Sequence, residues 1–221
     1  MAHRYAIIVA GGRGLRMGAD LPKQFLPLRG EPVLMHTLRQ FAHEVEELIL
    51  VLPAEQQDLW RELCAEHHFT LPHRITTGGA TRFDSVRSGL SKLPAEGIVA
   101  VHDGVRPLVS RTLIRRTFEV AEETGAALPA CPITDSLRLL GEDDTNEAVD
   151  RAHYRAVQTP QTFDLERLHR AYEQPFSPQF TDDASVYEAA GLGAITLVEG
   201  EETNIKLTTP RDLLLADLLL D

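Results

Sequence analysis

The sequence has few of the features that mark several large classes of protein. Its 221 residues include two cysteines, Cys64 and Cys131, which stand far apart. That spacing gives neither a disulfide framework nor the ligand pattern of a zinc site. No apolar run approaches the ~20 residues that a membrane-spanning helix needs. The strand-like start "YAIIVA" is too short for a signal peptide. We therefore expect a cytoplasmic protein without a membrane partner.

Positive charge is also scarce along the chain. The sequence has 22 Lys and Arg against 33 Asp and Glu, for a formal net charge of −11. Because phosphate backbones require a basic face, this balance argues against nucleic acid as a partner. It also draws attention to residues 10–23, "AGGRGLRMGADLPK", which combine glycines with Arg13, Arg16 and Lys23.

Short β-branched runs alternate with amphipathic segments along most of the chain. Such alternation predicts βαβ units and a largely parallel sheet. We therefore expect an α/β fold: a Rossmann-like, mostly parallel twisted sheet with helices on both faces, in a single domain over 1–221. The C-terminal segment begins with Thr209 as N-cap and Pro210 at the first helical position. The expected strands are 5–9, 48–52, 98–102, 127–131 and 194–198, and the other expected helices are 32–42, 54–67, 81–93 and 110–124.

Residues 133–157 break the alternation. They form two extended pieces around the polar turn "GEDDTNE", which predicts a protruding β-arm. An exposed strand edge is a liability, so the arm is expected to pack on something, and a second subunit is one candidate. The apolar "LLLADLLL" near the C-terminus is expected to serve core or dimer packing.

Four polar or glycine-rich loops are expected to meet at one edge of the sheet, where doubly wound folds bind ligands. They are 10–23, 76–82, 102–107 and 199–206. A dinucleotide fingerprint starting at Gly12 fails at Met17, and the G-K-[S/T] of a P-loop is missing. Glycine backbone close to a triphosphate, assisted by Arg16 and Lys23, remains as the functional interpretation. The alternative is a solvated turn whose charges are incidental.

Ordered motifs over nearly the whole chain resemble one enzyme family. "GGRGLRMG", "PKQFLPL", "GGATRFDSV", "VHDGVRP", "VQTPQTF", "TDDAS" and "NIKLTTPRDL" are together similar to the 2-C-methyl-D-erythritol 4-phosphate cytidylyltransferases of non-mevalonate isoprenoid synthesis. The resemblance implies transfer of CMP from CTP to a polyol phosphate, with Mg²⁺ as cofactor and pyrophosphate as product. It also implies a homodimer whose arm reaches the partner's substrate.

The resemblance assigns roles residue by residue. The catalytic cations are Arg16, Lys23 and Lys206. Asp103 is expected to hold Mg²⁺, the ribose or both, because Mg²⁺ prefers one or two carboxylates plus substrate phosphates. The expected CTP-binding residues are Ala10, Gly11, Gly12, Gly14, Gly79, Ala80, Ser85, Asp103 and Gly104. The expected substrate-binding residues are Ser136, Arg151, Thr159 and Thr181.

Several positions carry a plainer alternative. Ser85 could be a solvent-facing helix serine, Asp103 a cap for the following loop, and Thr181 the N-cap of the helix that begins "DDAS". Arg106 could be catalytic, but a structural ion pair is the favoured interpretation. The histidines, among them His102, are expected to be surface or packing residues.

The sequence also departs from the family pattern. Family members often have an acid just before "NIK", where this chain has Thr203, so Glu201 or Glu202 could substitute for it or Asp103 could act alone. Ala80 likewise stands where an acid is common. The rival functions are a ribitol 5-phosphate cytidylyltransferase, a non-catalytic nucleotide-binding protein and a hexose-phosphate nucleotidyltransferase. "PITDS" and "TDDAS" favour methylerythritol over ribitol.

Overall fold

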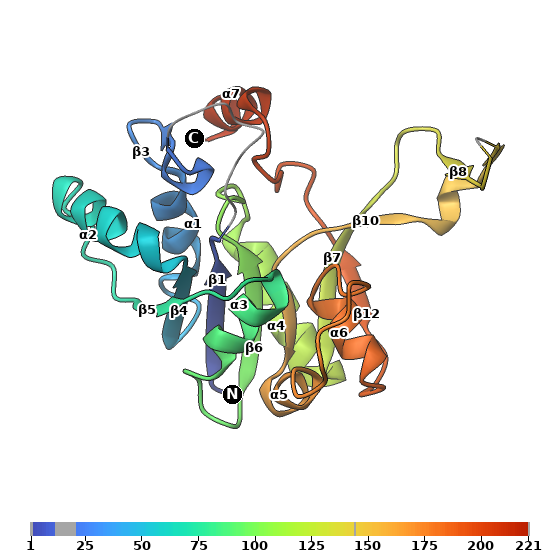
Figure 1. The fold of residues 1–221 in the computed structure, drawn as a ribbon, viewed down its shortest axis with the longest axis horizontal. Coiled ribbons are helices and arrows are strands. Elements are labelled where there is room, and N and C mark those ends of the chain that lie inside the picture. The colour runs from blue at the N-terminus through green and yellow to red at the C-terminus, as the bar shows by residue number, and fades with distance from the viewer. Residues whose placement is uncertain (1, 12–20, 144, 221) are drawn as a thin grey trace.

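The computed structural model describes residues 2–11, 21–143 and 145–220. Their main feature is an eight-stranded sheet with the order β10-β7-β11-β6-β1-β4-β5, in which β12 also pairs with β7. The strands are β1 (Arg4–Val9), β4 (Glu47–Leu52), β5 (Arg74–Thr77), β6 (Ile98–Asp103), β7 (Ala126–Pro132), β10 (Arg155–Val157), β11 (Gln161–Asp164) and β12 (Thr196–Glu199). Figure 1 shows this sheet through the middle of the molecule.

Parallel pairing dominates one half of the sheet and aligns the strand ends. β1 runs parallel to both β4 and β6, and Val9 pairs with Val51 on one side and with Asp103 on the other. β4 is in turn parallel to β5. β11 is antiparallel to β6 and β7, and β10 is antiparallel to β7. The predicted α/β fold with a mostly parallel sheet is confirmed.

Helices cover both faces of the sheet, as expected from its apolar strands. In β1, Ala6 and Ile8 join the core on one face, whereas Tyr5 and Ile7 join the core on the other. The first face is covered by α1 (Val33–Phe41), α2 (Gln57–Glu66) and α4 (Arg111–Thr124), and the second by α3 (Arg82–Leu90), α5 (Leu165–Ala171) and α6 (Asp183–Ala189). The period of two therefore assigns successive side chains to opposite cores.

The expected elements lie close to their predicted positions. The run 54–67 divides into the short η3 (Ala54–Gln56) and α2. α7 (Pro210–Leu219) begins as predicted, with Thr209 as N-cap in a capping box and Pro210 at the first position. The strands β5 and β11 and the helix α5 were not predicted, because these elements are short and rich in polar residues. β10 lies at the end of the second extended piece predicted within 133–157.

The predicted arm is an antiparallel hairpin of β8 (Arg138–Leu140) and β9 (Asn146–Ala148), in which Arg138 pairs with Ala148. It leaves the sheet between β7 and β10 and extends away from the rest of the chain (Figure 1). Both of its strands are exposed, and the Leu140 residue is 78% exposed to solvent. Nothing within the described chain covers this apolar side chain.

The C-terminal helix contributes less to the core than its composition implied. Ala216 is its one fully buried residue, while Leu214 and Leu218 are 70% and 80% exposed. The helix packs beside a small ribbon of β2 (Pro27–Leu28) and β3 (Glu31–Pro32), seen at the top of Figure 1. No helix in the described ranges is long and apolar enough to cross a membrane.

Candidate functional site

A cavity of about 510 Å³ opens where the parallel strands β1, β4, β5 and β6 end. It unites the loops that the sequence placed at this edge. The predicted residues on its wall are Ala10, Gly11, Lys23, Gly79, Ala80, Ser85, Asp103 and Lys206. Gly12, Gly14 and Arg16 lie outside the described residues.

Asp103 and Lys206 form an ion pair in this cavity. Asp103 ends β6 and is buried, and Lys206 Nζ lies 2.9 Å from its Oδ2. Burial alone would raise the pKa of Asp103, but the charges of Lys206, Arg82 and Arg106 outweigh it and hold this pKa well below its ordinary range. The carboxylate is therefore ionised throughout the neutral range and holds a lysine ammonium at the cavity wall.

Arg106 forms an ion pair with Asp103, as predicted from the sequence. Its Nε lies 3.4 Å from Asp103 Oδ2, and its guanidinium also donates to the carbonyl oxygen of Asn204 at 2.7 Å. Asn204 is fully buried and donates to the carbonyl oxygen of Thr159 at 2.8 Å. Arg106 thus connects the β6 end to the loop that carries Lys206.

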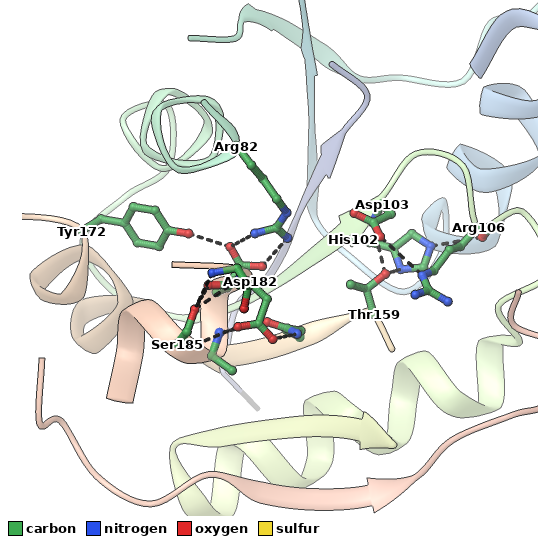
Figure 2. A network of polar contacts seen from close by, with 12 residues as sticks. Arg82, His102, Asp103, Arg106, Thr159, Tyr172, Asp182 and Ser185 are labelled. Atoms are coloured by element: carbon green, nitrogen blue, oxygen red, sulfur yellow. Dashed lines mark hydrogen bonds and ion pairs between the residues drawn. The ribbon is translucent and has the colours of Figure 1, made fainter. Parts of the chain in front are cut away.

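Thr159 has a different environment from the one expected of a substrate ligand. It is 5% exposed and is not part of the cavity wall. Its hydroxyl accepts the Asp103 N–H at 3.2 Å and lies 2.9 Å from His102 Nδ1 (Figure 2). His102 is fully buried against Phe41, which lowers the pKa of the imidazole to about 4. His102 is therefore a core residue and not a surface residue.

The glycine loop before α3 has close contacts that explain its composition. Gly79 N–H donates to Ser85 Oγ at 3.2 Å, and Ser85 in turn donates to the carbonyl oxygen of Thr81 at 3.0 Å. A Cβ on Gly78 would lie only 2.9 Å from Ser85 Oγ. Ser85 is 5% exposed, so the solvent-facing alternative is wrong. The loop is held tightly against the first turn of α3.

Gly104 allows the turn after β6 to lie close to the end of β1. A Cβ at this position would lie 2.9 Å from Ala10 Cβ and 3.0 Å from Leu34 Cδ1. Glycine lets the turn after β6 pack against the end of β1. Gly104 itself is not on the cavity wall, so its effect on a ligand there is exerted through this packing.

Arg82 is a wall residue that the sequence reading did not single out. Its guanidinium binds the fully buried Asp183 through two hydrogen bonds of 2.8 and 2.6 Å. Tyr172 donates to the same carboxylate at 2.6 Å (Figure 2). The pair joins the "GGATR" and "TDDAS" motifs, but no spacing rule connects positions so far apart in sequence. Arg82 adds a fixed cation near Asp103.

The N-cap of α6 is Asp182, so the alternative role proposed for Thr181 is wrong. Asp182 accepts the Ser185 N–H at 2.9 Å in a capping box. A carboxylate at this position also interacts favourably with the helix dipole. Thr181 is exposed and lies outside the cavity wall. Ser136 and Arg151 are exposed on the arm, where Arg151 donates to the carbonyl oxygen of Thr134.

A buried glutamine fixes the segment that carries Lys23. This segment is the short η2 (Lys23–Phe25). Gln24 is fully buried and donates to the carbonyl oxygen of Ala10 at 2.8 Å and to Gln56 Oε1 at 2.6 Å. These bonds hold η2 against the end of β1 and place Lys23 on the cavity wall.

Asp103 is a residue at this site that fits Mg²⁺ as a ligand. Within the described ranges no group of three His, Cys, Asp or Glu residues could hold a metal. Asp103 Oδ2 is shared by Lys206 Nζ and Arg106 Nε. One carboxylate fits a cation whose remaining ligands are phosphates and water. The Glu201 carboxylate accepts hydrogen bonds from the Ser110 N–H and hydroxyl at the start of α4, and Glu201 does not line the cavity.

The fold and the cavity together define a class. Glycine loops at the edge of a parallel sheet, lysine and arginine cations and the ionised Asp103 carboxylate are together typical of a nucleotidyltransferase. The model of the 2-C-methyl-D-erythritol 4-phosphate cytidylyltransferase family matches residues 5–221. The chain belongs to this family, whose enzymes transfer a cytidylyl group from CTP in isoprenoid synthesis.

Individual relatives agree with this assignment. The cytidylyltransferase of that name from Porphyromonas gingivalis is 56% identical over 98% of this chain and 97% of its own. The one from Bacteroides thetaiotaomicron is 54% identical over 97% and 98%. Among solved structures, 4-diphosphocytidyl-2C-methyl-D-erythritol synthase from Anaerococcus prevotii has a TM-score of 0.82 at 29% identity, covering 99% of this chain and 98% of its own. The Thermus thermophilus cytidylyltransferase has a TM-score of 0.76 at 34% identity, with 96% of both chains covered.

Proposed function

We propose that the cavity binds CTP and that this chain transfers CMP to 2-C-methyl-D-erythritol 4-phosphate with release of pyrophosphate. The observation that supports this most directly is the meeting of Lys23, Lys206 and Asp103 on one glycine-lined wall. Two polyanions must approach each other in this reaction, and fixed cations offset their repulsion.

The reaction needs no covalent enzyme intermediate. A monoester oxygen of the polyol phosphate attacks the α-phosphorus of CTP, a new P–O bond forms, and the bond to the pyrophosphate oxygen breaks. Catalysis then consists of positioning the two substrates and stabilising the charge on the five-coordinate phosphorus. We assign this stabilisation to Lys23, Lys206 and Arg16.

Lys206 is suited to this task by its geometry. Its ammonium has three donors, and Asp103 occupies one of them. The remaining donors are available to phosphate oxygens while the ion pair keeps the side chain in place. Asp103 and Arg106 therefore restrain a lysine that would otherwise lose more conformational freedom on binding substrate.

For the base and ribose of CTP, we propose contacts from Gly79, Ala80 and Ser85 and from the β6 end. Gly78 and Gly79 pack closely against Ser85 and Asp84 at the start of α3, and both glycines lie on the cavity wall. Since Ala80 has no acidic side chain, any contact from this position uses its backbone. Gly11 and Ala10 present the main chain at the end of β1.

We propose Mg²⁺ as cofactor, held by Asp103 together with substrate phosphates. When bound, Mg²⁺ neutralises negative charge on the triphosphate. The chain's own contribution is an ionised carboxylate that Lys206 and Arg106 orient.

We also propose a homodimer that forms through the arm. Leu139 and Leu140 on the hairpin are 54% and 78% exposed, and Tyr154 and Val157 beside it are 45% and 42% exposed. Exposed apolar side chains gathered on one segment of the chain are typical of an interaction surface. In such a dimer Ser136 and Arg151 would reach the partner's polyol phosphate, and Thr181 would complete that site.

The cell compartment follows from the substrates. CTP is a cytoplasmic metabolite, and the free Cys64 and Cys131 suit a reducing environment. We therefore propose a cytoplasmic enzyme, with neither nucleic acid nor membrane as partner.

Pyrophosphate release with CTP and Mg²⁺ tests the substrate. We expect release with methylerythritol 4-phosphate and none with ribitol 5-phosphate, and a chelator should abolish it. Release with ribitol 5-phosphate alone would keep the nucleotide and the mechanism but replace the acceptor. No release with either would support a non-catalytic nucleotide-binding protein.

A further inference from the structure

We propose that His102 is a positioning residue that holds Asp103 through a directed chain of hydrogen bonds across the Thr159 hydroxyl. His102 does not line the cavity, and its imidazole forms hydrogen bonds with Arg106 and Thr159. Its effect on the reaction is exerted through the backbone of the turn after β6. This inference rests on the proposed roles of Asp103 and Lys206.

The hydrogen bonds determine the tautomer of the imidazole. Nε2 lies 3.1 Å from the carbonyl oxygen of Arg106, which can only accept, so Nε2 carries a hydrogen. Nδ1 lies 2.9 Å from Thr159 Oγ1, which already accepts the Asp103 N–H. The hydroxyl hydrogen has Nδ1 as its acceptor among the described residues. Thr159 therefore donates to an unprotonated Nδ1.

The chain of bonds closes on the two ends of one turn. The Asp103 N–H donates to Thr159, Thr159 donates to His102, and His102 donates to the Arg106 carbonyl oxygen. The turn itself is closed by the Arg106 N–H, which donates to the carbonyl oxygen of Asp103 at 3.1 Å. His102 thus braces the residues on either side of the Asp103–Arg106 turn from within the protein.

The same turn is bonded to the loop that carries Lys206. Arg106 donates to the carbonyl oxygen of Asn204, and Asn204 donates to that of Thr159. Lys206 follows two residues later and pairs with Asp103. If the Thr159 hydroxyl changed its orientation, the positions of Asp103 and of the loop that carries Lys206 would therefore both change.

This arrangement differs from simple core packing. The His102 ring packs on Phe41 at 5.0 Å between centroids, and an apolar ring could fill that space. An apolar ring could not accept from Thr159 and donate to Arg106 at once. Partners that orient a residue at a catalytic centre typically change activity by roughly 10- to 100-fold when they are removed.

The test compares Thr159→Val, Thr159→Ser and His102→Phe in the full-length enzyme. Pyrophosphate release gives kcat and KM for CTP and for the polyol phosphate. We expect Thr159→Val and His102→Phe to lower kcat by roughly 10- to 100-fold with KM for both substrates changed less than about 3-fold. Thr159→Ser keeps the hydroxyl and should restore kcat to within about 3-fold of the wild type. Thr117→Val, at a buried threonine that bonds only within α4, is the matched control and should leave kcat unchanged.

A direct measurement keeps the test independent of variant folding. The ¹⁵N spectrum of histidine side chains in the wild type should show His102 with Nε2 protonated and Nδ1 bare, and Thr159→Val should shift the Nδ1 resonance. An Nδ1–H tautomer would overturn the proposal. So would a Thr159→Val variant that raises KM for the polyol phosphate alone, since this would make Thr159 a substrate ligand. Wild-type activity, measured first, separates these outcomes from failure of the proposed function.

Discussion

Lys206 Nζ lies 2.9 Å from Asp103 Oδ2, and this ion pair joins the end of β6 to the loop after β12. The two residues are remote in sequence, yet together they place one negative and one positive group on a single cavity wall. Arg106 and Arg82 add further positive charge around the same carboxylate. The site is therefore organised for phosphate groups around one strongly acidic aspartate.

Removal of the Lys206 charge tests its role in the transition state. We expect Lys206→Met to lower kcat by about 10²- to 10³-fold, the typical loss for one preorganised donor. Pyrophosphate release under saturating CTP measures this effect. Lys92→Met, at an exposed lysine far from the cavity wall, is the control and should leave kcat unchanged. A Lys206→Met enzyme with wild-type kcat would remove Lys206 from the catalytic set.

The Arg82–Asp183 pair should contribute strongly to stability. Asp183→Asn leaves the Arg82 guanidinium without its buried counter-charge, so we expect the free energy of unfolding to fall by about 3 kcal/mol. Urea denaturation followed by circular dichroism measures this change. Asp58→Asn disrupts the exposed Arg61 pair and should change stability by less than about 1 kcal/mol. Equal effects of the two substitutions would contradict this account.

A pH-dependent contact involves the single tryptophan. Trp60 Nε1 donates to His73 Nε2 at 3.0 Å, and His73 Nδ1 bonds the carbonyl oxygen of Leu71 at 2.7 Å. Burial lowers the pKa of His73, so the unfolded chain binds more protons in the window below about pH 6.5. The stability from neutral His73 is therefore present above that pH and falls as pH decreases through the window.

Substitution isolates this contribution from those of the other histidines. His73→Gln removes the titration but keeps a carboxamide oxygen that can accept from Trp60. We expect the urea midpoint of the variant to depend less on pH between about 6.5 and 5 than that of the wild type. Trp60 fluorescence reports the transition in both proteins. Identical pH dependence in the two would show that His73 is not responsible.

Charge on the arm should prevent dimer formation. Leu139→Asp with Leu140→Asp places two carboxylates on the proposed interface, and we expect a monomer by analytical ultracentrifugation where the wild type is a dimer. Leu214→Asp with Leu218→Asp makes the matched change on the exposed face of α7 and should leave a dimer. If only the α7 variant becomes monomeric, the interface lies on α7. A monomeric wild type would remove the dimer from the mechanism.

Local patterns in the sequence were sufficient for much of the fold. The apolar runs at 5–9, 48–52 and 98–102 lie within β1, β4 and β6, because fully buried parallel strands have few polar residues. Thr209, Pro210 and Asp212 marked the start of α7 through bonds that span only a few residues. β11 was missed because "QTFD" contains polar residues whose burial depends on partners elsewhere in the chain.

The sequence by itself determined the elements, the loops at one sheet edge and the motif residues that resemble a cytidylyltransferase, since each depends on short-range patterns or on ordered motifs. Only the tertiary structure decided which of these residues act together. It paired Arg82 with Asp183, turned Glu201 to the start of α4 and placed the Thr159 hydroxyl between His102 and Asp103. These contacts join segments distant in sequence, and their geometry is fixed by packing in the core, where each buried polar group must find a partner.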